Sequence, residues 1–180
     1  EGRGGYLNAF TQQETTCFYA RVPAESAPLA LDVLSDMVCA PRLASADVAL
    51  ERAVILEELA QYRDQPDAHV FDLAGEALWA GHALGRPLVG SPRTLGAVTS
   101  ASLEAFRQRH YRADGAVLAV AGRVDPAAWV AQAASCVERL PRGTAPGFRR
   151  AGPKTRLRAL VTDARAIEQT HLVLAFRGFG

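Results

Sequence analysis

The sequence lacks the short motifs that identify several common enzyme classes. It contains no H-E-x-x-H zinc motif, no P-loop, no G-x-G-x-x-G fingerprint and no G-x-S-x-G nucleophile elbow. No apolar run approaches the roughly 18 residues that a membrane-spanning helix needs. Function must therefore be sought in other side-chain patterns, and we expect no membrane partner.

Neither sign of charge is in excess, and cysteine is scarce. The 20 basic and 19 acidic residues leave a net charge of +1, which gives no general attraction to nucleic acid. Cys17, Cys39 and Cys136 have no metal-type spacing, so we expect small buried thiols in a reducing compartment. With no leader visible, we expect a cytoplasmic location in a bacterium, with the periplasm as the alternative. The chain begins at Glu1 rather than Met, and we expect a fragment whose beginning is missing.

Apolar periodicity, helix caps and turn residues predict a mixture of strands and helices. Strands are predicted where β-formers or short apolar runs lie between turns. Helices are predicted where apolar residues recur at helical spacing behind a capping residue. The predicted strands are Tyr6–Thr11, Thr16–Val22, Ala116–Ala121, Leu157–Thr162 and Thr170–Phe176. The predicted helices run from Ser26 to before Pro41, then within Asp47–Asp67, where Ser45 or Asp47 is the N-cap and Pro66 ends the helix, and over Asp67–Ala80, Thr99–Tyr111 and Asp125–Leu140.

This order of elements predicts an α+β fold, with a mostly antiparallel sheet and helices packed on one face. Residues 116–121 and 170–176 should be interior strands, because their apolar runs suit burial on both faces. Residues 6–11 should lie at or near an edge. Residues 141–158 hold six basic residues and no acid, which we interpret as a solvated linker.

The helix predicted over Asp47–Asp67 carries the strongest candidates for chemistry. At about 100° per residue, one face carries two glutamates among apolar side chains: Val48, Glu51, Ile55, Glu58, Leu59 and Tyr62. Glu57 points away from that face. We therefore expect Glu51 and Glu58 to face the same concave side, and Glu57 not to. A carboxylate on a core-facing stripe is costly unless it is paired, protonated or bound to a metal.

Three interpretations of Glu51 and Glu58 remain open from the residues alone. The two side chains lie at the edge of the core or pair with arginines, or one is a metal ligand or a base, or together they form the carboxylate pair of an inverting glycosidase. A metal would need histidines from outside the chain, because its own four histidines offer no i, i+4 pair. The E-x-x-H spacing of Glu168 and His171 falls in a predicted strand, and we attribute it to chance.

Several segments resemble the M16 family of zinc metallopeptidases, which includes pitrilysin, insulin-degrading enzyme and the mitochondrial processing peptidases. GGYLNAFTQQETTCFYARV resembles the family's GG-x-x-N-A-x-T strand and the strand after it. ERAVILEEL resembles its ER-x-V-I-x-E-E helix, and LGRPLVG is similar to its L-G-R-P-I-x-G loop. LEAFRQRHYRADGAVLAVAGRVD and EQTHLVLAF are similar to later segments, so the correspondence runs in order from Gly4 to Phe176.

The resemblance implies a zinc-dependent endopeptidase with the α+β fold of M16 and LuxS-like metalloenzymes. Glu58 corresponds to the family's third zinc ligand, and Glu51 to a further acid near the metal, which makes it a candidate catalytic residue. The family's H-x-x-E-H motif, which holds two histidine ligands and the general base, is expected upstream of Glu1. In the family, zinc polarises the scissile carbonyl and activates water. The chain alone is therefore expected to be inactive.

The resemblance also implies how a substrate is held. Family members add the substrate as an extra strand beside the Asn-Ala strand, which carries over to Asn8 and Ala9, with Phe10 and Thr11 flanking them. We expect peptide or protein substrates, pairing with a second M16-like chain in a homodimer or heterodimer, and no nucleic-acid partner.

One incomplete domain is expected over residues 1–180. Residues 1–97 would form the N-terminal part of the peptidase with the third zinc ligand, and residues 98–180 the following part of the same fold, with the basic linker at 141–158. The alternative is a non-catalytic M16-like partner or core subunit that acts as a scaffold. A nucleic-acid-binding module, which rests only on the basic linker, is a more distant alternative.

Overall fold

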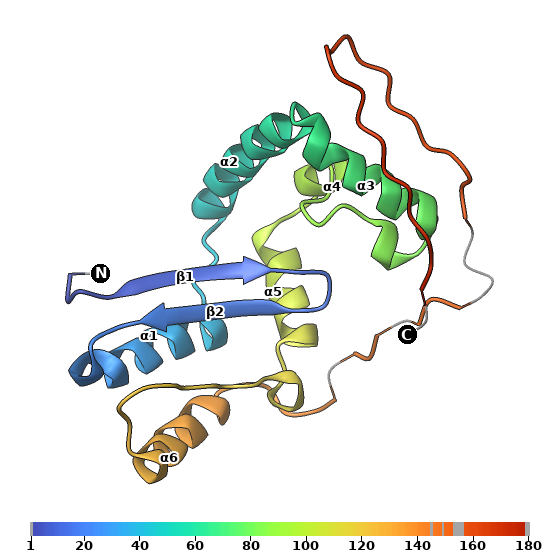
Figure 1. Cartoon of the computed structure of the whole chain (residues 1–180). Coiled ribbons are helices and arrows are strands. Elements are labelled where there is room, and N and C mark those ends of the chain that lie inside the picture. The colour runs from blue at the N-terminus through green and yellow to red at the C-terminus, as the bar shows by residue number, and fades with distance from the viewer. Residues whose placement is uncertain (1, 145, 149, 153–156, 179–180) are drawn as a thin grey trace. The chain divides into compact units, whose positions relative to one another are not determined.

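The computed structural model describes residues 2–144, 146–148, 150–152 and 157–178 (Figure 1). They form two compact units, Glu1–Ser45 with Thr99–Gly147 and Ala46–Val98 with Phe148–Gly180. The elements in chain order are β1 (Tyr6–Thr11), β2 (Thr16–Arg21), η1 (Ala24–Ser26), α1 (Ala27–Cys39), α2 (Ser45–Arg63), α3 (Pro66–Leu78), η2 (Ala83–Gly85), α4 (Pro92–Gly96), α5 (Ser100–His110), η3 (Ala113–Gly115) and α6 (Pro126–Val137), where η marks a 3₁₀ helix.

The first unit contains the antiparallel hairpin of β1 and β2. Its register pairs Tyr6 with Arg21 and Thr11 with Thr16, and the Gln12 amide donates to the Thr15 carbonyl at 2.7 Å in the turn. Helix α1 packs against β2 and buries Leu31, which is 5% exposed (Figure 1). The hairpin therefore has one face supported by a helix.

Local capping fixes where the later helices of the first unit begin. The Thr99 hydroxyl accepts from the Ser102 amide and the Ser102 hydroxyl accepts from the Thr99 amide, so a reciprocal capping box starts α5. Asp125 accepts from the first amides of α6, and Pro126 follows at a position where no amide hydrogen is needed. Both helix starts agree with the sequence prediction.

Two arginines join separate helices of the first unit. Arg107 on α5 donates to the Cys39 carbonyl at the end of α1, with Nη1 and O 3.0 Å apart. Arg139, which follows α6, forms an ion pair with Asp36 on α1, with Nη2 and Oδ1 3.0 Å apart. The C-terminal end of α1 therefore has polar links to α5 and to the end of α6.

The second unit contains α2 and α3, which meet at a tight connection. Pro66 occupies the first turn of α3, and the Tyr62 hydroxyl donates to the Ala68 carbonyl at 3.1 Å across the connection. Leu59 on α2 is 4% exposed. The turn at Gly85 requires glycine, because a Cβ there would lie 2.6 Å from the Trp79 carbonyl oxygen.

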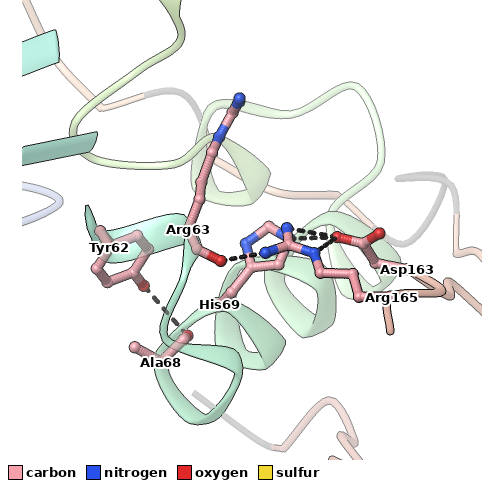
Figure 2. A network of polar contacts seen from close by, with 6 residues as sticks. All are labelled: Tyr62, Arg63, Ala68, His69, Asp163 and Arg165. Atoms are coloured by element: carbon pink, nitrogen blue, oxygen red, sulfur yellow. Dashed lines mark hydrogen bonds and ion pairs between the residues drawn. The ribbon is translucent and has the colours of Figure 1, made fainter. Parts of the chain in front are cut away.

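The C-terminal segment of the second unit has no regular secondary structure where it is described. Polar contacts hold it beside α3. The Arg158 amide donates to the Ala77 carbonyl at 2.8 Å. Asp163 accepts from Arg165 and lies 3.1 Å from His69 Nε2, while Arg165 also donates to the Arg63 carbonyl (Figure 2). Arg177 lies 4.5 Å from the centre of the Trp79 ring. These anchors hold the segment against the α3 region without a sheet.

The predicted helices are confirmed, with small shifts at their ends. Helix α2 runs from Ser45 to Arg63 and ends before the extended Gln65 and before Pro66, as predicted, and α3 begins at Pro66 itself. Ser26 occupies the predicted N-cap of α1, but its side chain makes no capping hydrogen bond. The short helix α4 follows the loop that contains LGRPLVG, and no helix was predicted there.

Three predicted strands are wrong. Residues 116–121, 157–162 and 170–176 have no strand structure. Instead of lying inside a sheet, Val117 is 94% exposed and Phe176 is 85% exposed. A strand needs a hydrogen-bonded neighbour, and an apolar run does not encode one. Within the described residues the sheet has two strands, β1 and β2, and residues 6–11 lie at its edge as predicted.

The α+β class is correct, since helices and an antiparallel pair of strands are both present. The division into parts 1–97 and 98–180 stays a prediction. The predicted linker 141–158 is irregular where it is described, while residues 145, 149 and 153–156 of it lie outside the described residues. Among the described helices, none is both long and apolar enough to cross a bilayer.

Candidate functional site

Helix α2 places Glu51 and Glu58 on one side of its axis. Residues seven apart in an α-helix differ by about 20° in direction and by about 10 Å along the axis. Measured from the buried Leu59, Glu51 and Glu58 lie about 80° and 100° round the helix, and Glu57 about 160°. The two candidate glutamates therefore lie together beside the buried face of α2, while Glu57 lies nearly opposite that face.

The expectation that Glu51 and Glu58 lie within a core-facing stripe is wrong. Leu59 is buried and Val48, Ile55 and Tyr62 are half-buried, but both glutamates are exposed, as is Glu57. The buried arc centres on the apolar residues, and water solvates carboxylates at its margin at no desolvation cost. The prediction that Glu51 and Glu58 share a concave side, and that Glu57 does not, is not tested by exposure alone and stays a prediction.

The Glu58 carboxylate has the chemistry of a zinc ligand but not a complete set of neighbours. It is exposed, and in the part of the chain described here it takes part in no ion pair. Among the described residues, no group of three or more His, Cys, Asp or Glu side chains is arranged to hold a metal ion. A catalytic zinc takes three protein ligands, so these residues do not form a zinc site by themselves.

The outer edge of β1 is the second candidate site. The Gln12–Thr15 hydrogen bond closes the hairpin, and hydrogen-bonded pairs then alternate along it at Phe10–Cys17 and Asn8–Tyr19. By this alternation the amide of Ala9 points away from β2. The Asn8 side chain accepts a hydrogen bond from that amide, with Oδ1 and N 2.8 Å apart. The outward-facing amide of Ala9 is therefore already hydrogen-bonded to the side chain of the preceding residue, Asn8.

Aromatic side chains cover the face of the hairpin that carries Asn8. The ring centres of Tyr6 and Phe10 each lie 6.1 Å from that of Tyr19, and Asn8 Nδ2 donates to the Tyr6 hydroxyl. Tyr6, Phe10 and Tyr19 are 50%, 46% and 38% exposed. The hydrogen bond with Tyr6 raises the pKa of Tyr19, with burial as a smaller cause. Thr11, at the end of β1, is also exposed.

Two groups of interacting side chains were not predicted from the sequence. Tyr6 and Tyr19 could have been found by period-two alternation, which places them on the face of Phe10. The group formed by His69, Asp163 and Arg165 had no detectable signal, because His69 and Asp163 are 94 residues apart (Figure 2). Glu168 and His171, attributed to chance, lie in the irregular C-terminal segment.

Two profiles of one protein family together match most of the chain. A profile described as insulinase, peptidase family M16, matches residues 1–92, and a profile described as peptidase M16 inactive domain matches residues 97–180. An uncharacterized zinc protease of Mycobacterium tuberculosis H37Rv is 40% identical over 180 residues, covering 97% of this chain and 40% of the relative. The uncharacterized zinc protease YmxG of Bacillus subtilis is 35% identical over 181 residues, covering 97% of this chain and 42% of the relative. The chain thus spans about two fifths of the length of these relatives.

Solved structures have the same fold. Pitrilysin superposes with a TM-score of 0.73 at 24% identity, over 84% of this chain and 17% of that chain. A peptidase M16 inactive domain from Pseudomonas fluorescens superposes with a TM-score of 0.73 at 19% identity, over 82% of this chain and 36% of that chain. Since the insulinase profile matches residues 1–92 of 180, just over half of the sequence, the chain belongs to the insulinase family of peptidases, M16.

Proposed function

We propose that this chain is part of a zinc-dependent metalloendopeptidase that cleaves peptides bound by strand addition. The observation that carries the proposal is the family match over residues 1–92, which contain both Glu58 and the Asn-Ala strand. Relatives that match nearly the whole chain are named zinc proteases. The proposed arrangement is a mostly antiparallel sheet with helices on one face, to which β1, β2 and α1 would belong.

Glu58 is assigned the role of a zinc ligand, and Glu51 that of an acid beside the metal. Because the Glu58 carboxylate is exposed, a cation could bind it without first breaking an ion pair. Glu51 lies two helical turns before it on the same flank of α2. By the family resemblance, the two histidine ligands and the general base would come from outside this chain. Bound zinc would supply Lewis acidity and an activated water.

The edge of β1 is assigned the role of substrate anchor. A peptide strand that pairs with β1 would offer a carbonyl to the outward amide of Ala9 and displace the Asn8 side chain from it. The released Asn8 amide group can then bond the peptide. Because main-chain groups form these bonds, they would hold peptides of many sequences, while the exposed Phe10 and Thr11 would contact alternate side chains.

A non-catalytic role is the second candidate. Residues 97–180 match a profile described as an inactive domain, and a similar solved structure bears the same description. Such a chain would serve as a scaffold or as the partner of a catalytic chain, in either a homodimer or a heterodimer. We also propose a cytoplasmic bacterial location, with the periplasm as the alternative.

The test compares glutamate variants of the full-length protein that contains this chain. Glu58→Gln should lose most of the bound zinc, because an amide is a poor and uncharged substitute for a carboxylate ligand. Glu51→Gln should keep more zinc and lose turnover. Glu57→Gln is the matched control, since Glu57 neighbours Glu58 but points about 100° away from it around α2, and it should change neither quantity.

Zinc content is measured by metal analysis and turnover with a quenched fluorescent peptide. Equal zinc content in the unmodified protein and in Glu58→Gln would show that the ligand assignment is wrong. If the full-length protein carries an intact H-x-x-E-H motif, holds zinc and cleaves no peptide in any pairing, the scaffold role replaces the peptidase role.

A further inference from the structure

Cys39 and Cys136 lie beside each other although they are 97 residues apart in sequence. Cys39 is the last residue of α1, and Cys136 lies in the last turn of α6. The Cys39 thiol donates to the Cys136 carbonyl, with Sγ and O 3.8 Å apart. Both residues are free thiols of intermediate exposure, so a small reagent can reach them.

Two polar contacts hold the ends of these helices at the cysteines. The ion pair of Arg139 and Asp36 joins positions three residues from each cysteine, which is about one helical turn. The bond from Arg107 to the Cys39 carbonyl fixes the backbone of Cys39 itself. The approach of the two cysteines is therefore supported on both sides and does not depend on a loop.

We propose that Cys39 and Cys136 form a reversible disulfide that joins α1 to α6. Both helices belong to the first unit of the chain, so the bond would need no rearrangement between units. Cys17, the remaining cysteine, lies on β2 and not at either helix end, whereas Cys39 and Cys136 are in contact.

The electrostatic surroundings assign an order to the exchange. Burial raises the pKa of the Cys39 thiol, and the guanidinium groups of Arg139 and Arg107 act in the opposite direction. A thiol with a raised pKa is a slow first nucleophile. The Cys39 thiol proton is also engaged by the Cys136 carbonyl, so Cys39 is assigned the second step, which completes the bond, and Cys136 the first.

The oxidant is a small disulfide such as oxidised glutathione. The Cys136 thiol loses its proton and attacks one glutathione sulfur, forming a mixed disulfide and releasing one glutathione thiolate, which takes up a proton. The Cys39 thiol then loses its proton and attacks the Cys136 sulfur, which releases the second glutathione thiolate. The protein loses two electrons and two protons in total, and one oxidised glutathione becomes two reduced molecules.

The disulfide would restrict the motion of α1, the helix that supports the β1–β2 hairpin. Helix α1 packs against β2, and β2 pairs with β1. A covalent link from the end of α1 to α6 would restrain that helix in the oxidised protein. The role of the bond is thus redox control of the rigidity of the first unit.

The test is peptide mapping of the full-length protein after treatment with oxidised glutathione under native conditions. Free thiols are alkylated before denaturation and tryptic digestion. Trypsin cuts after Arg3, Arg21, Arg42, Arg123 and Arg139, which places each cysteine in a peptide of its own. We expect a linked pair of peptides, 22–42 with 124–139, whose mass is about 2 Da below their sum. Reduction with dithiothreitol before the alkylation step should return both peptides to the alkylated, unlinked form.

Variants separate the steps and control for Cys17. Cys17→Ser should give the same linked pair, and Cys39→Ser should accumulate glutathione on Cys136. Three outcomes would overturn the proposal: both cysteines stay fully alkylated after oxidation, the link includes Cys17, or either cysteine pairs with a residue outside this chain. Mapping of the unmodified protein decides between these outcomes even if a variant fails to fold.

Discussion

Arg107 holds the Glu104 carboxylate with two parallel hydrogen bonds on α5, Nε to Oε2 at 2.9 Å and Nη2 to Oε1 at 2.7 Å. This two-point geometry is the strong form of an arginine–carboxylate pair. The hydrogen bonds from Arg107 and then from Gln108 lower the pKa of Glu104 from its ordinary 4.5 to about 2. The same arginine bonds the Cys39 carbonyl, so the pair also supports the contact between α5 and α1.

This pair predicts a loss of stability in acid. Because the native pKa of Glu104 is depressed, its contribution is complete above the ordinary value of 4.5 and is lost as the pH falls towards about 2. Glu104→Gln should therefore lower the melting temperature at pH 7, and the difference from the unmodified protein should shrink below pH 4. Circular dichroism melts across this range measure it, with Glu57→Gln as the exposed control. An equal difference at pH 7 and pH 3 would contradict the assignment.

Leu59 predicts where the second unit is most sensitive to truncation. Leu59 is 4% exposed, whereas Leu50 on the same helix is 69% exposed. Leu59→Ala should lower the free energy of unfolding by about 2 to 4 kcal/mol, because it leaves a cavity as well as losing apolar contact. Leu50→Ala should change it by less than about 0.5 kcal/mol. Urea denaturation followed by circular dichroism measures both, and similar effects of the two variants would show that α2 does not bury Leu59.

The outward amide of Ala9 predicts a selective defect in substrate binding. Ala9→Pro removes that amide hydrogen while leaving the β1–β2 hydrogen bonds in place, since proline is tolerated at strand edges. In the full-length protein it should raise KM for a quenched fluorescent peptide several-fold and leave the zinc content unchanged. Ala9→Ser, which keeps the amide, is the matched control. A rise in KM of the same size in both variants would mean that the side chain, rather than the strand edge, contacts the peptide.

The sequence was informative where structure depends on near neighbours. The start of α5 at Thr99 and of α6 at Asp125 follows from capping bonds that span two or three residues. The hairpin of β1 and β2 is equally local. For the same reason, the rotation of Glu51 and Glu58 relative to Glu57 could be worked out once a helix was predicted.

Features that depend on distant contacts could not be predicted in this way. Residues 116–121 and 170–176 have the composition of strands, but composition does not supply the neighbour that a strand needs. The exposure of Glu58 depends on which side of α2 is covered, and a helical wheel gives only relative directions. The approach of Cys39 to Cys136 spans 97 residues, and no spacing rule for cysteines covers it.

The exposed C-terminal segment has a consequence for how concentrated solutions of the chain behave. Leu172, Leu174 and Phe176 are 76%, 75% and 85% exposed and recur at every second residue, and in the described part of the chain no strand pairs with them. An apolar stretch with unpaired backbone groups is a template for cross-β association between molecules. Colloidal stability rather than folding stability would then set the highest concentration at which the chain stays monomeric.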